Sequence, residues 1–322
     1  MTLPPARASW FLAACVVVAG CAPSGAAPAD AKASAASVDA SATPDASDSS
    51  YVARRIEAEP AVPVNGFRIV FFDVGQGDAI LVQTGTGETL LVDGGKSDSL
   101  LHDRLQRLGV DHIDAIVATH GDADHIGGLL AALEDYDVGT VYWNGSTDKD
   151  TSIFKAFFAA VVAEGSTVGV LKRGDRIELG EFHAVVVNPR NPLTGDSNGD
   201  SVVLSFGCLG TKVLLTGDAE FGAETDMATA GALEDIDVLK VAHHGANSAT
   251  SDAFLAEIKP EVGILSVGQK NAYGHPAAAT LDRLNHAGVA LWTTDVTDQD
   301  DSIELVTDCG SPYVVRRVYG VR

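Results

Sequence analysis

Positive charge and aromatic side chains are scarce in this sequence of 322 residues. It carries 22 lysines and arginines against 44 aspartates and glutamates, a formal net charge of −22, and 6% of its residues are aromatic. The lack of positive charge argues against a basic groove that binds a nucleic-acid backbone, although a metal site can supply positive charge locally. The lack of aromatic residues argues against an extended base-stacking surface. With 46% hydrophobic and 20% charged residues, the composition is that of a globular protein.

Long apolar segments are also missing except at the N-terminus, so the sequence excludes a polytopic membrane protein. Trp10–Ala19 is a short apolar region behind Arg7, which is the arrangement of an export signal. It leads into Val18-Ala19-Gly20-Cys21, which resembles a bacterial lipobox. Residues 1–21 therefore predict a lipoprotein signal peptide, with Cys21 lipidated and inserted into a membrane. The alternative is an ordinary cleavable signal with a chance cysteine.

The segment that follows lacks the apolar side chains that a core needs. Of the 29 residues 22–50, 21 are Ala, Ser or Pro, so burial cannot offset the entropy lost on ordering. We expect residues 22–64 to form a flexible tether that reaches roughly 35 Å on average. Residues 65–322 then form the folded domain, with 18 basic against 38 acidic side chains. The sequence thus predicts an exported, extracytoplasmic lipoprotein of the cell envelope.

Cysteine is rare, with four in the whole chain. Cys15 and Cys21 belong to the signal segment, which leaves Cys208 and Cys309 in the domain. In an oxidising compartment these two can form a disulfide, and as buried thiols they can also stay free. Both follow apolar runs that can be neighbouring strands, and we expect them to be paired.

The domain alternates short apolar runs with amphipathic segments, which predicts an α/β layered fold. Gly109 and Gly288 follow the first and last amphipathic segments as stop signals. Residues 188–200, rich in Pro, Gly, Asn and Asp, predict a loop. Strands are predicted at Ile69–Phe72, Ala79–Val82, Thr89–Val92, Ala115–Thr119, Val202–Phe206, Val213–Thr216, Ile236–Val241, Glu261–Val267 and Ile303–Val306. Helices are predicted at Ser99–Leu108, Ile126–Leu133, Ile153–Glu164, Ala253–Ile258 and Ala277–Ala287.

Polar motifs occur where several predicted strands stop. Loops at the carboxyl ends of strands build the active sites of layered α/β folds, so we expect these motifs to converge. They are Asp73-Val74-Gly75-Gln76-Gly77-Asp78, Asp93-Gly94-Gly95, His120-Gly121-Asp122-Ala123-Asp124-His125, Thr216-Gly217-Asp218 and His243-His244-Gly245.

The densest of these motifs places four side chains that can bind metal within six residues. On an extended loop, residues two apart point the same way, so His120 and Asp122 can hold one ion. Asp124 and His125 then face a second ion from the start of the following helix, where Gly127-Gly128 permits close packing. A solvated acidic turn is the plainer interpretation, and the buried strand ahead of the motif favours the metal site.

At these residues the chain resembles the metallo-β-lactamase fold superfamily, and specifically the hydrolase domain of ComEC-type DNA-uptake proteins. The resemblance implies an αββα sandwich with a dinuclear metal centre at the sheet edge. The similar segments follow the family's order and cover most of residues 66–322. They are Phe72–Ala79, Leu91–Gly95, Thr119–Gly128, Leu215–Glu220, Val238–Gly245 and Tyr273-Gly274-His275-Pro276.

The resemblance implies ligands for two divalent metal ions. Asp218 matches the carboxylate that bridges both ions, and His243 matches the late histidine ligand. His244 beside it is an alternative ligand or a residue that contacts the substrate. The implied metal ligands are His120, Asp122, Asp124, His125, Asp218 and His243.

Other matched residues have supporting or catalytic roles. Asp93 matches a structural acid that holds the His120 loop by hydrogen bonds. We expect Asp73 and Asp78 to form turns and support the ligands, in preference to binding metal themselves. His275 either donates a proton or holds a phosphate oxygen, or is a structural cap before Pro276. The implied catalytic residues are Asp124, His244 and His275.

Two departures from the wider superfamily affect the choice of metal. The usual second histidine of the motif is Asp122 here, as in the ComEC-type branch. Another histidine that usually completes the first site has no counterpart between Asn188 and Ser201, where Asn198 and Asp200 are the nearest substitutes. An oxygen-rich first site favours Mn²⁺ over Zn²⁺, or it is only half-occupied. The sequence shows no counterpart of the membrane channel of ComEC-type proteins, so we expect that this chain does not itself transport DNA.

The sequence therefore predicts an exported, membrane-tethered metallohydrolase that acts on a phosphodiester, possibly DNA. Bound metal ions activate water and stabilise charge on the attacked group. A net charge of −20 on the domain favours a small or lipid-linked phosphodiester over DNA. The alternatives are a carbonyl hydrolase, such as a lactonase or β-lactamase, and a non-catalytic lipoprotein with a degenerate site. We predict no stable protein partner.

Overall fold

The computed structural model describes residues 61–147, 149–294, 296–297 and 300–319. The predicted signal peptide 1–21 and nearly all of the predicted tether 22–64 lie outside these residues, so both stay predictions. None of the helices within the described ranges is long and apolar enough to cross a membrane.

The first sheet has eight strands in the order β15-β14-β1-β2-β3-β4-β5-β6. From β3 to β6 the neighbouring strands run parallel, and the remaining pairs are antiparallel. The strands are β1 (Phe67–Phe71), β2 (Ala79–Thr84), β3 (Thr89–Gly94), β4 (His112–Ala118), β5 (Asp137–Trp143), β6 (Thr167–Val170), β14 (Asp301–Thr307) and β15 (Val314–Tyr319).

The second sheet has seven strands in the order β13-β12-β11-β10-β9-β8-β7. Here β10 to β13 run parallel, while β7, β8, β9 and β10 pair antiparallel. The strands are β7 (Arg176–Leu179), β8 (Phe182–Asn188), β9 (Val203–Cys208), β10 (Thr211–Leu215), β11 (Val238–Lys240), β12 (Val262–Leu265) and β13 (Ala290–Thr293).

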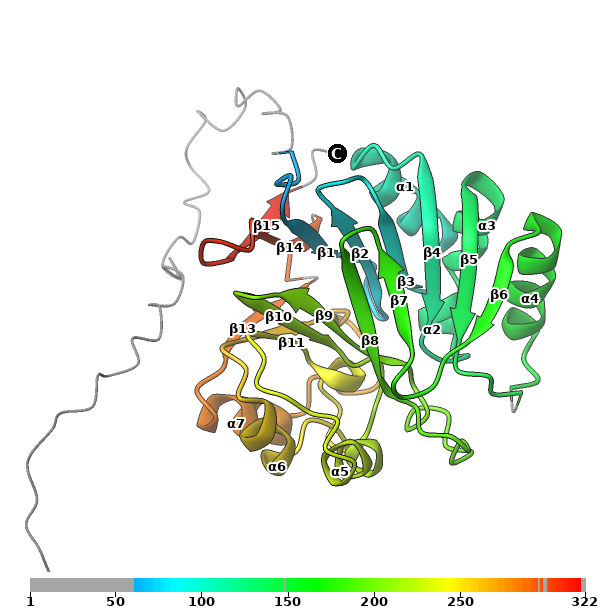
Figure 1. Cartoon of the computed structure of the whole chain (residues 1–322). Coiled ribbons are helices and arrows are strands. Elements are labelled where there is room, and N and C mark those ends of the chain that lie inside the picture. Colours follow the sequence, from blue (N-terminus) through cyan, green and yellow to red (C-terminus); the bar gives the residue numbers. More distant parts are fainter. Residues whose placement is uncertain (1–60, 148, 295, 298–299, 320–322) are drawn as a thin grey trace, which may run out of the picture. The chain divides into compact units, whose positions relative to one another are not determined.

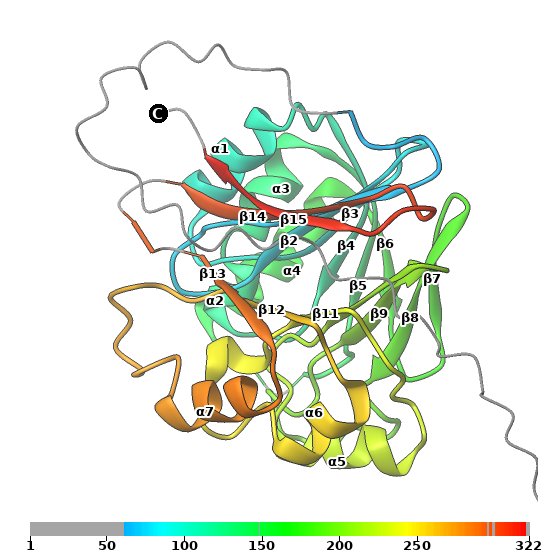
Figure 2. The same ribbon diagram turned by 90° about the vertical axis from the view of Figure 1, so that its left-hand side faces the viewer.

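The two sheets face each other across one apolar core, and helices cover both outer faces (Figure 1). Phe67 of β1 packs edge-on against Phe206 of β9, with ring centroids 4.9 Å apart. The outer face of the first sheet packs against α1 (Asp98–Arg107), α3 (Leu129–Asp135) and α4 (Ser152–Glu164). The outer face of the second packs against α5 (Phe221–Thr229), α6 (Asp252–Ile258) and α7 (Ala278–His286) (Figure 2). The predicted αββα sandwich is confirmed.

All nine predicted strands coincide with observed strands, and four of the five predicted helices with observed helices. The helix predicted at Ile126–Leu133 is wrong as a single element. It is divided into α2 (Ala123–Ile126) and α3 (Leu129–Asp135) at Gly127-Gly128. A Cβ atom on Gly128 would lie 2.0 Å from the carbonyl oxygen of Gly94. The break therefore lets the chain pass close to the end of β3.

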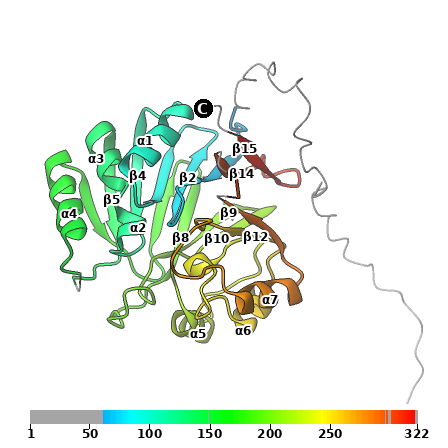
Figure 3. The same ribbon diagram turned by 180° about the vertical axis from the view of Figure 1, so that it is seen from behind.

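The parallel strands of both sheets end on the same side of the sandwich. The Val202 amide donates to the Thr119 carbonyl (2.9 Å), and Thr119 follows β4 while Val202 precedes β9. The loop predicted at 188–200 leads into this contact between the sheets. Figure 3 shows the strand ends and the connecting loops from behind. The loops after β3, β4, β10 and β11 therefore meet at one edge.

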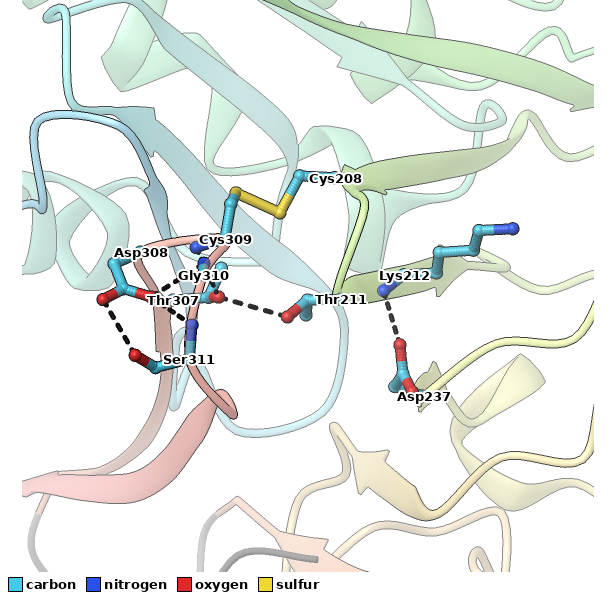
Figure 4. The surroundings of a disulfide bond; sticks show 9 residues. All are labelled: Cys208, Thr211, Lys212, Asp237, Thr307, Asp308, Cys309, Gly310 and Ser311. Atoms are coloured by element: carbon cyan, nitrogen blue, oxygen red, sulfur yellow. Dashed lines mark hydrogen bonds between the residues drawn. A yellow bond between two sulfur atoms is a disulfide. The ribbon is translucent and has the colours of Figure 1, made fainter. Parts of the chain in front are cut away.

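A disulfide joins Cys208 to Cys309, with Cα atoms 5.8 Å apart (Figure 4). Cys208 ends β9, and Cys309 lies in the turn after β14. In the register of the first sheet, Phe71 pairs with Ile303 and Phe67 with Thr307, so β14 runs away from the site edge. The bond therefore links the two sheets at the end opposite the converging loops. The predicted pairing is confirmed.

Candidate metal centre

Residues from both sheets form one His/Asp cluster at the shared edge. Asp122 precedes α2, and Asp124 and His125 lie in its only turn. Asp218 follows β10, and His244 lies in a short turn, Ala242–Gly245, directly after β11. The His/Asp cluster consists of His120, Asp122, Asp124, His125, Asp218 and His244.

One side of the cluster is formed by His120, Asp122 and Asp218. Nε2 of His120 lies 3.6 Å from Oδ2 of Asp122 and 3.9 Å from Oδ2 of Asp218. The predicted side-by-side placement of His120 and Asp122 is therefore present in the structure. These separations leave room for one ion between the three side chains.

The other side is formed by Asp124 and His244, again with Asp218. Nε2 of His244 lies 3.6 Å from Oδ2 of Asp124 and 3.5 Å from Oδ1 of Asp218. His125 lies between the two sides, with its Nε2 3.3 Å from Oδ2 of Asp218. The two oxygens of Asp218 thus face different groups of donors, as a bridging carboxylate requires.

The cluster fits a metal because its inner ring nitrogens have no other partner. Nε2 of His120, His125 and His244 and Oδ1 of Asp218 are buried and accept or donate no hydrogen bond within the described part of the chain. Leaving four such atoms unpaired in the interior is costly. Imidazole nitrogen and carboxylate oxygen are suitable ligands for divalent transition metals, so the residues fit the implied ions.

The histidines and carboxylates of the cluster shift one another's pKa. Burial alone would raise the pKa of Asp218, but His244 and His125 hold it well below its usual range. Burial alone would lower the pKa of His244, but Asp218 and Asp78 raise it to about 9. The carboxylates therefore create a negative potential in which positive charge is stabilised.

Asp93 supports the cluster from behind. Its Oδ1 accepts the backbone N–H of Thr119 (2.8 Å) and its Oδ2 accepts the Thr119 hydroxyl (2.7 Å). Oδ2 also lies 2.7 Å from Nδ1 of His125. These bonds orient the His125 ring so that Nε2 faces the cluster, and they hold the segment that carries His120.

His243 and His244 are adjacent in sequence but differ in their position relative to the cluster. Both adopt left-handed backbone angles, with φ of 48° for His243 and 53° for His244. His244 is buried inside the cluster, whereas His243 is partly exposed, with Nε2 3.6 Å from Oδ2 of Asp218 and its ring centroid 6.1 Å from that of His244. Nδ1 of His243 lies 3.0 Å from Oε1 of Glu220. His244 thus lies among the donors of the cluster and His243 lies beside them, and which of the two binds a metal ion stays a prediction.

Asp78 supports His244 and is itself paired with a buried lysine. Oδ1 of Asp78 lies 3.4 Å from Nδ1 of His244, and Oδ2 lies 2.8 Å from Nζ of Lys240. Nδ1 of His244 also lies 2.8 Å from the carbonyl oxygen of Ser266. Burial alone would raise the pKa of Asp78, but Lys240 and His244 lower it to about 2. Asp78 therefore stays ionised next to the ring.

Asp73 lies at the turn after β1 and outside the cluster. Its Oδ1 accepts the N–H of Gly75 (3.2 Å) and its Oδ2 accepts the N–H of Asp301 (3.1 Å). It therefore fixes the turn to the start of β14, as expected for a residue that forms a turn and does not bind metal.

His275 lies beside the cluster. Its ring centroid is 5.4 Å from that of His243 and 6.4 Å from that of His244. Burial, followed by the charges of His243 and His244, lowers the pKa of His275, which favours the neutral form of its ring. Asn271 accepts the N–H of His275 (3.1 Å) and donates to its carbonyl (2.6 Å). The proton-donor, phosphate-holding and structural roles of His275 all remain predictions.

Two residues that the sequence did not indicate also reach the site. Lys149, from the loop between β5 and α4, forms an ion pair with Oδ1 of Asp122. Ser201 lies 3.4 Å from Nδ1 of His120 through its hydroxyl, which also accepts the N–H of Asp218. Asp200 instead accepts hydrogen bonds from Thr194 and Gly195 in its own loop. No local pattern marked Lys149 or Ser201, because both arrive through loops.

The fold and the cluster agree with comparisons to known proteins. A family model described as the metallo-beta-lactamase superfamily matches residues 72–269, which is more than half of the chain. The chain therefore belongs to the metallo-β-lactamase superfamily, whose folds are generally those of metal-dependent hydrolases.

Within this superfamily the chain is similar to ComEC-type competence proteins, which confirms the resemblance found in the sequence. ComE operon protein 3 of Bacillus subtilis (strain 168) is 32% identical over 190 residues, covering 58% of this chain and 24% of that protein. Competence protein ComA of Neisseria gonorrhoeae is 29% identical over 240 residues, covering 74% and 32%. The chain thus spans about a quarter to a third of the length of these relatives.

Solved structures support the same fold. CmlA, a diiron beta-hydroxylase from Streptomyces venezuelae, aligns with a TM-score of 0.50 and 15% identity, covering 74% of this chain and 54% of CmlA. At this identity the likeness concerns the fold alone.

Proposed function

We propose that this protein is an exported, membrane-tethered, metal-dependent phosphodiesterase. The observation that carries the proposal is the composition of the His/Asp cluster. Three carboxylates, from Asp122, Asp124 and Asp218, stand among its six donors, and Asp122 occupies the place of a second histidine in the motif. Oxygen-rich sites favour harder ions, and we propose Mn²⁺ ahead of Zn²⁺. Such ions are suited to the charge of a phosphodiester.

In the proposed reaction the chain binds, orients and balances charge. Two bound divalent ions would activate water and stabilise the negative charge that develops on phosphorus. Lys149 places an ammonium group at the rim beside Asp122, where it attracts an anionic substrate to an otherwise acidic protein. Glu220 orients His243 so that its Nε2 lies 3.6 Å from Oδ2 of Asp218, where the ring would hold a proton for the leaving oxygen.

The names of the relatives also support a nucleic-acid phosphodiester. Two of them are named as a competence protein and a product of the ComE operon. We therefore propose DNA as one substrate, cleaved outside the cytoplasm by a domain held to the membrane through Cys21. The predicted lipobox and tether support this location.

Metal analysis combined with a phosphodiester assay tests the proposed activity. The purified protein should bind two Mn²⁺ per chain and hydrolyse bis(p-nitrophenyl) phosphate, with no comparable activity on a β-lactam or a lactone. Hydrolysis of the lactam or lactone alone would show a carbonyl hydrolase. A protein that binds no metal and cleaves none of the three would be a non-catalytic lipoprotein.

Replacement of Cys21 tests the proposed location. Cys21→Ser should leave the precursor unprocessed or release the domain from the membrane fraction, because no thiol remains to carry the lipid. A wild-type protein that is soluble and lacks lipid by mass spectrometry would contradict the proposal.

A further inference from the structure

Tyr273 is an exposed aromatic side chain near the His/Asp cluster. Its side chain is 67% exposed, although the chain has few aromatic residues and most of its large apolar side chains are buried. The ring stacks on His275 with centroids 5.8 Å apart and an interplanar angle of 27°. His275 in turn packs edge-on against His243, whose Nε2 faces Asp218. The His275 ring centroid also lies 6.4 Å from that of His244, so Tyr273 is two ring contacts away from the cluster.

The loop that presents Tyr273 is held in place without the help of its ring. The Asn271 side chain donates to the carbonyls of Gly268 (2.8 Å) and His275 (2.6 Å). Its Oδ1 accepts the N–H groups of Tyr273 (3.0 Å) and His275 (3.1 Å). The start of the loop is anchored to Gln76, whose Oε1 accepts the N–H of Gly268 (3.2 Å). The backbone thus fixes an aromatic ring whose outer face is in solvent.

We propose that Tyr273, backed by His275, is a stacking platform for the nucleobase next to the scissile phosphate, so that the preferred substrates are nucleotide phosphodiesters. This inference rests on the proposed phosphodiesterase function. In this proposal a phosphodiester held at the cluster places a flanking base on the side of His275, where Tyr273 offers an exposed ring face. Stacking is tolerant of sequence because every base has a flat face.

The same geometry disfavours a lipid or polyol phosphodiester. A flexible, hydroxylated group gains little from a flat aromatic face, whereas a base gains both apolar contact and stacking. An acidic protein has little positive charge with which to bind a nucleic-acid backbone. One stacked base therefore supplies affinity that electrostatic attraction does not. The platform therefore gives specificity to a site that otherwise recognises only the phosphate.

Steady-state kinetics on matched substrates test the platform. The first substrate is a single-stranded oligothymidylate, and the second is the same strand with abasic tetrahydrofuran units. For Tyr273→Ala we expect KM on the thymidylate to rise about 5- to 100-fold with little change in kcat. Tyr273→Phe and Tyr273→Trp should restore KM, because either ring can stack. On the abasic strand the wild type and Tyr273→Ala should converge. Equal KM changes on both substrates, or no change on either, would overturn the inference.

Failure of the proposed function has a separate signature. If the wild type cleaves neither strand with Mn²⁺ or Zn²⁺, the phosphodiesterase proposal fails. The platform is then tested by fluorescence anisotropy with the two labelled strands and Mn²⁺. Tighter binding of the thymidylate that disappears in Tyr273→Ala supports the platform, and equal or absent binding of the two strands overturns it. An oligouridylate in the same assay distinguishes RNA from DNA as the source of the base.

Discussion

Three residues in or beside the His/Asp cluster have backbone angles that L-residues rarely adopt. Asp93, His243 and His244 have φ of 57°, 48° and 53°. Each such residue costs on the order of 1–3 kcal/mol, and the cost is borne where the surrounding structure fixes the conformation. Here it turns two consecutive histidines toward the same site and brings Asp93 behind His125. The unfavourable backbone angles therefore occur where they position the side chains of the His/Asp cluster and its support.

Asp218 is the residue on which both halves of the cluster depend. Asp218→Asn keeps the side-chain shape but removes the negative charge between two cations, so at least one metal ion should be lost. Activity on the wild-type substrate should fall by several orders of magnitude while the circular dichroism spectrum is retained. Metal analysis by mass spectrometry and initial rates measure both effects.

Asp282→Asn is the matched control, because Asp282 is exposed on α7 and remote in sequence from every donor. It should change neither metal content nor rate. An Asp218→Asn protein that keeps two metal ions, or near-normal turnover, would show that Asp218 does not bridge.

Glu224 gives a pH dependence that does not involve the cluster. Its buried carboxylate accepts the N–H groups of Thr250 and Ser251, and burial raises its pKa above 4.5 despite these bonds. A carboxyl group with a raised folded-state pKa contributes stability that is full below its unfolded pKa and is lost as the pH rises through the folded pKa. The free energy of unfolding of the wild type minus that of Glu224→Gln should therefore fall as the pH rises above about 4.5.

Urea denaturation at a series of pH values on both sides of 4.5 measures this difference. A difference that is constant or increases with pH would contradict the raised pKa.

At the residue scale, the sequence predicted the donors that are close together in the chain. His120, Asp122, Asp124 and His125 form one motif, and its spacing on a loop and a helix start is enough to place them. The choice between His243 and His244 was not predictable, because a pair of left-handed residues decides which ring enters the cluster. Lys149 also escaped prediction, since its place depends on the path of a long loop.

At the scale of elements, the break between α2 and α3 is set by close backbone contact. The Gly128 N–H donates to the carbonyl of Gly95 (3.0 Å), and a Cβ atom at this position would collide with the Gly94 oxygen. Gly128→Ala should lower the free energy of unfolding by about 1–3 kcal/mol, because the backbone must shift. Metal affinity should also fall, because α2 carries Asp124 and His125. Thermal denaturation and metal titration measure the two effects.

Gly222→Ala in α5 is the control for this prediction. A Cβ atom at Gly222 meets nothing within 4 Å, so stability should be unchanged or raised by up to about 1 kcal/mol. Equal destabilisation by both substitutions would mean that the contact with Gly94 is unimportant.

Strands were predictable where both faces are buried and not where one face is exposed. The nine apolar runs found in the sequence all lie in strands, as in β1, which is buried throughout. The six strands missed are mixed in pattern. β6 is an edge strand with mostly exposed residues, and β15 carries Arg316 and Arg317 between its valines. Packing against neighbouring strands, and not local apolar density, forms these elements.

At the scale of the whole molecule, the two sheets are joined by different chemistry at their two ends. The disulfide closes a sequence separation of 101 residues at one end. The chain-entropy model assigns such a loop about 4.7 kcal/mol, and measured values are often lower. The double variant Cys208→Ser, Cys309→Ser should lose about 2–5 kcal/mol of unfolding free energy and retain its metal content, because the cluster lies at the opposite end. Chemical denaturation and metal analysis test this, and metal loss would contradict it.

Removal of bound metal should destabilise the end of the sandwich that carries the His/Asp cluster, opposite the disulfide. A ligand present at about 1,000 times its Kd stabilises the folded state by about 4.1 kcal/mol, so a chelator should lower the melting temperature strongly and reversibly. Hydrogen exchange in the metal-free protein should increase first in the loops after β4, β10 and β11. A uniform increase in hydrogen exchange over the whole domain would contradict this expectation, because it would show that the two ends of the sandwich are not stabilised separately.

The disulfide also bears on when the molecule acquires its stability. In a reducing cytoplasm the bond between Cys208 and Cys309 does not persist, so a newly made chain lacks the link between its sheets. If the chain is exported as proposed, the precursor is at its least stable while it must remain unfolded enough for translocation. Formation of the disulfide outside the cytoplasm then stabilises the folded state. The disulfide would thus make export one-way, because it forms only after the chain has crossed the membrane and then opposes unfolding.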